Sequence, residues 1–178
     1  MSLLGPSATA IQADTGRGPT IVIYKSQRRL LYFENDILKQ RFPMSLGKHP
    51  RGEKRLQGDS RTPEGEYFIS SIRPRSRFHF FMGLSYPNAR DAEDGLRRGV
   101  ISRPEYGRIR QAIRSGSEPP WGTALGGFVG IHGEGTGYRG FVRRHHIDWT
   151  DGCVALSNED IRTLSDLVEV GTPVLILP

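Results

Sequence analysis

The segment TIVIYKSQRRLLYFENDILKQRF (residues 20–42) alternates short apolar runs with short polar ones. The apolar runs, 21–24, 29–33 and 37–42, are rich in β-branched or aromatic residues, which suit the half-buried surface of a sheet. The tripeptides between them, 25–27 and 34–36, have the polar composition of tight turns. This segment therefore predicts a meander of three strands.

The rest of the chain continues the pattern, because the runs 66–72, 78–84, 128–131 and 174–177 are further candidate strands. One helix is predicted over 103–115, after the capping-box residues Ser102 and Glu105. Another is predicted to begin after Ser157 and to stop at Gly171. Many strands, two or three short helices and abundant Gly and Pro favour a mainly β sandwich or barrel over an alternating α/β fold.

The composition narrows the class of protein. A chain of 178 residues with 36% hydrophobic content is sufficient for one domain with one core. No apolar run approaches the roughly eighteen residues of a membrane-spanning helix, so no stable membrane span is expected. The net charge of +6 favours anionic partners. However, the basic clusters are scattered and no nucleic-acid-binding motif organises them, so no nucleic-acid partner is expected.

Residues 1–19 lack the alternation that begins at residue 20, and they are expected to form a flexible leader. Ala8-Thr9-Ala10 has the small residues of a signal-peptidase site, so a truncated signal peptide is one interpretation. An ordinary disordered leader is the other. We assign residues 20–178 to a single domain. The hydrophilic segment 90–120, with its predicted helix, is expected to be an insertion beside the site or a surface excursion.

The only cysteine, Cys153, lies in the glycine-rich segment IHGEGTGYRGFVRRHHIDWTDGCVAL (residues 131–156). A single cysteine forms no internal disulfide, which leaves a buried thiol, a metal ligand or a nucleophile. The surrounding glycines indicate tight turns or close backbone approach, as at a substrate cleft. His132 ends one apolar run and Cys153 begins another, so adjacent strands would bring an imidazole to a thiol. That pairing activates cysteine nucleophiles.

The motifs IHG (131–133) and TDGCVAL (150–156) resemble the catalytic signature of the L,D-transpeptidases of the YkuD type. The segments RTPEGEYFI (61–69) and FHFFMGLSYPNARD (78–91) are similar to further parts of that family. The resemblance therefore covers most of the chain after residue 20. It implies a YkuD-like β-sandwich or barrel as the catalytic domain.

The resemblance also implies a role for each matching residue. Cys153 would attack the acyl donor and form a thioester, and His132 would take the thiol proton. The backbone carbonyl of Gly133 would hold the imidazole in one tautomer. The amides of Asp151, Gly152 and Cys153 would form the oxyanion hole.

Two positions depart from the family pattern. Asp151 stands where many members carry His, and this matters little because the site needs the backbone amide at that position. Ala155 stands where many members carry Arg, so the motif does not identify the group that binds a substrate carboxylate. The candidates to replace that arginine are Arg139, Arg143 and Arg144.

Several other residues are candidates for binding the substrate: Thr150 at the family's Ser/Thr position, Trp149, Tyr86 and His79. Packing explains Trp149, Tyr86 and His79 equally well. The pair His145-His146 could ligate a metal, but its spacing from Asp148 and Cys153 matches no compact zinc pattern. No metal or other cofactor is expected, because a thiol, an imidazole and backbone amides supply every chemical role.

The resemblance implies a bacterial enzyme of the periplasm or cell envelope. It would be a cysteine L,D-transpeptidase that transfers a peptidoglycan tetrapeptide stem to an acceptor amine, on another stem or on an envelope lipoprotein. Three alternatives stay open. One is a cysteine hydrolase of the same fold, of the L,D-carboxypeptidase or amidase type. The second is a non-catalytic wall-binding module, and the third is a zinc peptidase.

Overall fold

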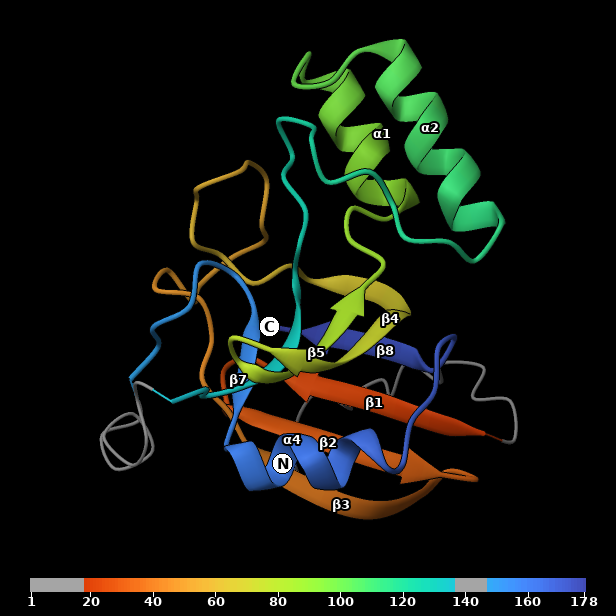
Figure 1. The fold of residues 1–178 in the computed structure, drawn as a ribbon. Coiled ribbons are helices and arrows are strands. Elements are labelled where there is room, and N and C mark those ends of the chain that lie inside the picture. The colour runs from red at the N-terminus through yellow and green to blue at the C-terminus, as the bar shows by residue number, and fades with distance from the viewer. Residues whose placement is uncertain (1–17, 137–146) are drawn as a thin grey trace, which may run out of the picture.

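The computed structural model describes residues 18–136 and 147–178, and the described part of the chain is mostly β (Figure 1). Its strands form one sheet in the order β3-β2-β1-β8-β4-β5-β6-β7. The strands are β1 (Pro19–Tyr24), β2 (Arg29–Glu34), β3 (Ile37–Pro43), β4 (Gly65–Ser76), β5 (His79–Leu84), β6 (Gly130–Gly133), β7 (Val154–Leu156) and β8 (Pro173–Leu177). The described helices are α1 (Ala89–Arg97), α2 (Arg103–Arg114) and α4 (Asn158–Ser165).

The predicted meander is present as β1, β2 and β3, which pair in antiparallel fashion. Asn35 and Asp36 form the two-residue turn between β2 and β3, with φ angles of 50° and 62°. Positive φ at both turn positions matches the right-handed twist of the two strands, and Asn and Asp tolerate it better than most residues. The local composition thus explains the turn and the pairing of Glu34 with Ile37 beside it, whereas the register shifts farther along, between Tyr32 and Phe33.

The two ends of the strand order approach each other, so the sheet is close to a closed barrel. Ser45, just after β3, exchanges two backbone hydrogen bonds of 2.9 Å with Ala155 in β7. β8 lies in the middle of the order, parallel to β1 and antiparallel to β4. The core inside this sheet consists of buried apolar side chains, among them Ile21, Ile23, Leu30, Ile69, Met82, Ile131, Val154 and Ile176. The mainly β sandwich or barrel expected from the sequence is confirmed.

Helix α4 directly follows β7 and packs against β5, β6 and β7. Its N-cap is Ser157, whose hydroxyl accepts a hydrogen bond from the backbone amide of Asp160, as the sequence predicted. The helix ends at Ser165 rather than continuing to Gly171. Val168 lies after the end of the helix, and its side chain is buried in the main core. The apolar spacing after Ser165 therefore reflects packing of a non-helical segment.

The segment 90–120 contains two helices where the sequence analysis predicted one. Helix α2 is confirmed, with the predicted cap at Ser102. Helix α1 was missed, although Asn88 and Asp91 form a capping box at its start. The two helices lie together at one end of the molecule, on the opposite side from α4 (Figure 1). They share a small hydrophobic cluster of their own: Ala92, Ile101, Ile109 and Leu125.

The predicted leader, 1–19, falls outside the described residues except for its last two positions, and β1 begins at Pro19. Among the helices of the described residues, none has the length and apolar character needed to cross a membrane. The assignment of residues 20–178 to one catalytic domain stays a prediction.

Candidate active site

His132 lies on β6, and Cys153 directly precedes β7, the neighbouring parallel strand. The register of β6 and β7 places His132 opposite Ala155. Because side chains alternate along a strand, Cys153, two residues before Ala155, lies on the same face as His132. Both side chains line one cleft of about 700 Å³. The two side chains thus open onto the same cleft, and their catalytic roles stay a prediction.

His132 is almost completely buried, with 1% of its surface exposed. Its Nδ1 lies 2.7 Å from the carbonyl oxygen of Gly133. A carbonyl only accepts hydrogen bonds, so Nδ1 carries the proton and Nε2 is left as the acceptor. The ring stacks on Phe78, with 4.2 Å between the centroids, and Trp149 contacts it edge-on at 5.7 Å. These contacts fix both the tautomer and the orientation of the imidazole.

Burial lowers the pKa of His132 to about 4, because the charged imidazolium loses its hydration. The positive charge of Arg77 lowers this pKa further, while the hydrogen bond to the Gly133 carbonyl raises it. The ring is therefore neutral at ordinary pH. A neutral imidazole with a vacant Nε2 lone pair can accept a proton.

The thiol of Cys153 is half-buried, and its Sγ lies 3.5 Å from the carbonyl oxygen of Phe128, to which it donates. Burial raises the pKa of this thiol to about 11. A backbone hydrogen bond from Gly130 and the charge of Lys54 act in the opposite direction. Both shifts favour a protonated thiol and a neutral imidazole over an ion pair in the resting site.

The turn that precedes Cys153 requires glycine at position 152. Gly152 has φ +135°, and an added Cβ would lie 2.8 Å from the carbonyl oxygen of Arg61. The buried hydroxyl of Thr150 closes the turn, because it donates to the Cys153 carbonyl at 2.7 Å and accepts from the Gly152 amide at 3.1 Å. Thr150 therefore lines the cleft with a hydroxyl that is engaged in holding the turn.

The segment before this turn is held by a salt bridge between Asp148 and Arg28, which lies far from it in the sequence. Asp148 accepts two hydrogen bonds from the Arg28 side chain at 3.0 and 2.6 Å and one from the Leu46 amide at 2.9 Å. The carboxylate of Asp148 is thus occupied in joining the β1–β2 turn to the approach to Cys153. Among the described residues, no group of three or more His, Cys, Asp or Glu is placed to hold a metal ion. His145 and His146 lie outside the described residues.

The remaining candidates for substrate binding are not all brought to the cleft. Trp149 lines it beside His132. Tyr86 does not, because it is fully buried in the core and its hydroxyl donates to the carbonyl of Leu125 at 3.0 Å. His79 lies at the start of β5, where its Nε2 contacts Arg162 of α4 at 2.6 Å, and it is not among the residues that line the cleft. Tyr86 and His79 are therefore left out of the proposed site.

Arg139, together with Arg143 and Arg144, lies outside the described residues. The structure instead places three basic residues in the cleft lining that the motifs did not identify: Lys48, Lys54 and Arg77. These residues are far from Cys153 in the sequence, so the spacing of the motifs could not predict that they line the cleft. The carboxylates in the described lining are Glu134 and Asp151.

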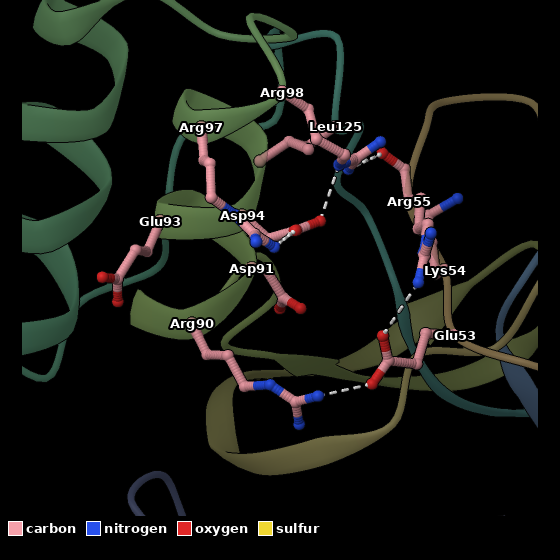
Figure 2. A pocket seen from close by; sticks show the side chains of 10 residues that line it. All are labelled: Glu53, Lys54, Arg55, Arg90, Asp91, Glu93, Asp94, Arg97, Arg98 and Leu125. Carbon is pink, nitrogen blue, oxygen red and sulfur yellow. Dashed lines mark hydrogen bonds and ion pairs between the residues drawn. The ribbon is translucent and has the colours of Figure 1, made fainter.

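A second cavity of about 450 Å³ lies between α1 and residues 53–55 (Figure 2). Its lining is almost entirely charged, and much of that charge is paired internally. Arg90 contacts Glu53 at 2.7 Å, and Asp94 contacts Arg97 and Arg98 at 2.5 and 2.6 Å. We therefore assign no ligand to this cavity.

The near-closed β fold and the cleft with one cysteine and one buried histidine define the class of protein. The family model of the YkuD L,D-transpeptidase catalytic domain matches residues 18–176, and the chain belongs to that family. This family consists of cell-envelope enzymes that act on peptidoglycan. No match is found among the curated proteins.

Solved structures resemble the fold at low sequence identity. Bd1075 from Bdellovibrio bacteriovorus is 21% identical with a TM-score of 0.57, and the match covers 93% of this chain and 50% of that one. The helical cell shape determining protein Pgp2 from Campylobacter jejuni is 19% identical with a TM-score of 0.58, covering 89% and 47%. An L,D-transpeptidase from Xylanimonas cellulosilytica is 15% identical with a TM-score of 0.50, covering 93% and 63%. The chain thus spans less than two thirds of each of these structures.

Proposed function

We propose that the chain is a cysteine L,D-transpeptidase of the cell envelope that acts on peptidoglycan tetrapeptide stems. The observation that carries the proposal is the placement of Cys153 and His132 on one face of β6 and β7, open to one cleft. The Gly133 carbonyl orients the imidazole so that Nε2 can accept the thiol proton. Family membership supplies the substrate class, and this geometry supports the chemistry.

In the proposed acylation, Sγ of Cys153 attacks the carbonyl carbon at the third residue of the stem while its proton moves to Nε2 of His132. The carbon–nitrogen bond to the terminal D-alanine then breaks, and the imidazolium returns the proton to the leaving amine. A thioester remains on Cys153. An acceptor amine, from another stem or an envelope lipoprotein, attacks this thioester and restores the thiol by the same proton path.

The pKa values of the resting site bear on the timing of this transfer. The thiol pKa of about 11 and the imidazole pKa of about 4 both disfavour a preformed thiolate–imidazolium pair. Proton transfer is therefore expected to accompany the attack on the bound substrate. The Gly152 amide is engaged by Thr150, so the oxyanion hole of the proposal relies chiefly on the amides of Asp151 and Cys153.

Mass spectrometry of purified tetrapeptide muropeptides incubated with the protein tests the proposal. The wild type is expected to release D-alanine and to form cross-linked dimers. Cys153→Ala is expected to reduce product formation by a factor of about a thousand or more, because the nucleophile is removed. A covalent carbapenem adduct that is present in the wild type and absent in Cys153→Ala would support the same nucleophile.

Other products would separate the alternatives. Tripeptides without dimers would assign the chain to the hydrolases of the same fold, with water as the acceptor. An unmodified substrate together with an unreactive thiol would leave a wall-binding module as the explanation and would contradict the proposal. Thermal unfolding of Cys153→Ala, compared with the wild type, checks that any loss of activity does not come from loss of the fold.

A further inference from the structure

One cation that lines the cleft forms no ion pair with the described part of the chain. Of the three basic residues in its lining, Lys48 pairs with Asp151 and Lys54 pairs with Asp59, both at 2.8 Å. Arg77 is exposed in the turn between β4 and β5, and none of the ion pairs formed within residues 18–136 and 147–178 includes it. Its Cζ lies 4.6 Å from the ring centroid of Phe78.

Arg77 is also tied to the reacting groups through that ring. Phe78 stacks on His132, with 4.2 Å between centroids and 23° between planes. The guanidinium of Arg77 and the imidazole of His132 thus both lie against Phe78. The positive charge of Arg77 lowers the pKa of His132 and that of the Cys153 thiol, so it acts electrostatically on both.

The structure of the leaving group indicates which substrate group would lie close to Arg77. The amine of the departing residue must reach His132 to collect its proton. In a terminal α-amino acid, a single carbon separates that nitrogen from the carboxylate, so the carboxylate must also lie near His132. A guanidinium matches a carboxylate with two parallel hydrogen bonds, which a point charge such as an ammonium does not.

We propose that Arg77 binds the terminal carboxylate of the acyl donor, supplying the recognition that Ala155, in place of the family's arginine, does not. This inference rests on the proposed function for the identity of the donor. It makes Arg77 a specificity residue: the enzyme would select donors that end in a free carboxylate. The Phe78 ring contacts the guanidinium at the cleft that His132 also lines, and it does not compete for the hydrogen-bond donors of the guanidinium.

Binding can be measured without turnover in the Cys153→Ala background. The probes are a tetrapeptide stem that ends in D-alanine and the same peptide that ends in D-alaninamide, each titrated by calorimetry. The acid is expected to bind about tenfold more tightly than the amide. Adding Arg77→Gln is expected to abolish this preference, and Arg77→Lys to restore part of it.

Arg75 provides the matched control, because it is an exposed arginine two residues before Arg77, near the end of β4, and does not line the cleft. Arg75→Gln should keep the full preference for the acid. A preference that persists in Arg77→Gln, or that is absent before Arg77 is changed, overturns the inference. If Arg77 had only a structural role, Arg77→Gln would weaken the binding of both peptides equally, and that result would also overturn the inference.

Turnover separates this inference from the proposed function. A wild type that processes the acid with no penalty from Arg77→Gln contradicts the role of Arg77 alone. A wild type that binds the acid selectively through Arg77 but never releases D-alanine contradicts the proposed function alone. Binding of neither peptide contradicts both.

Discussion

At the scale of single residues, burial sets the chemistry of the site. His132 and Cys153 are polar groups held among Phe78, Trp149 and the backbone of β6, and this environment disfavours charge on either of them. Both shifts favour a neutral imidazole, which can accept a proton, and a protonated thiol. The site is thus prepared for a coupled proton transfer rather than for storage of a thiolate.

The depressed pKa of His132 predicts a loss of stability in acid. The folded ring titrates at about 4, whereas a histidine in the unfolded chain titrates near 6.5. As the pH falls through this window the unfolded chain binds the proton and the folded chain does not, so the free energy of unfolding decreases. The full effect of this one group is roughly 3 kcal/mol. Urea unfolding at pH 7 and pH 4.5 measures most of it, because pH 4.5 lies inside this window and above the folded pKa.

His132→Gln should lose most of this dependence, because it has no titrating ring. His49→Gln is the control, since His49 is exposed, and it should keep the dependence of the wild type. The same acid sensitivity in His132→Gln as in the wild type would show that other groups cause it.

At the scale of elements, helix α4 supports the strand that carries His132. Asn158, the first residue of α4, accepts a hydrogen bond from the Gly135 amide at 3.0 Å and donates one to the Gly135 carbonyl at 2.8 Å. A Cβ at position 133 would lie 2.6 Å from Oδ1 of Asn158, so glycine allows this close approach. The start of α4 thereby positions the backbone that orients the imidazole.

Asn158→Ala is predicted to reduce turnover about tenfold and to lower the free energy of unfolding by about 1–2 kcal/mol. It removes both bonds to Gly135 and lets the Gly133 carbonyl move away from His132. Steady-state kinetics and urea unfolding give the two quantities. Glu159→Gln, at the exposed next position of α4, should change neither by much. Unchanged turnover in Asn158→Ala would show that the strand keeps its geometry without the helix.

At the scale of the whole molecule, the protein has two hydrophobic clusters of unequal size. The large one fills the near-barrel, and the small one joins α1, α2 and Leu125. A small cluster buries little apolar surface, so its elements should open at a lower free-energy cost than the sheet. The two helices are therefore expected to be less stable than the sheet that carries the cleft of Cys153 and His132.

Ile109→Ala should accelerate hydrogen exchange in residues 89–114 while leaving the strands of the sheet protected. Ile109 is fully buried in the small cluster, and its truncation costs about 2–5 kcal/mol, mainly there. Ile69→Ala, an equivalent change in the large cluster, should accelerate exchange throughout the sheet. Uniform acceleration by both variants would mean that the molecule unfolds as a single unit.

Much of the fold was predictable because its signals are local. The polar turn at Asn35-Asp36 and the caps at Ser102 and Ser157 act within a few residues, and each is found where the sequence indicated. Helix α1 was missed although its cap at Asn88 is equally local, because few apolar residues follow it. The C-terminal end of α4 was misplaced because an apolar spacing can equally serve a packed turn.

The amino-acid sequence alone specified the meander, the caps and the motifs that contain His132 and Cys153. Each of these depends on contacts between near neighbours in the chain. Only the tertiary structure decided that Phe78 stacks on His132, that Arg77 lines the same cleft and that Tyr86 belongs to the core. Those placements depend on the packing of β4, β5 and β6 against one another, where distant segments compete for the same space and spacing along the chain carries no information.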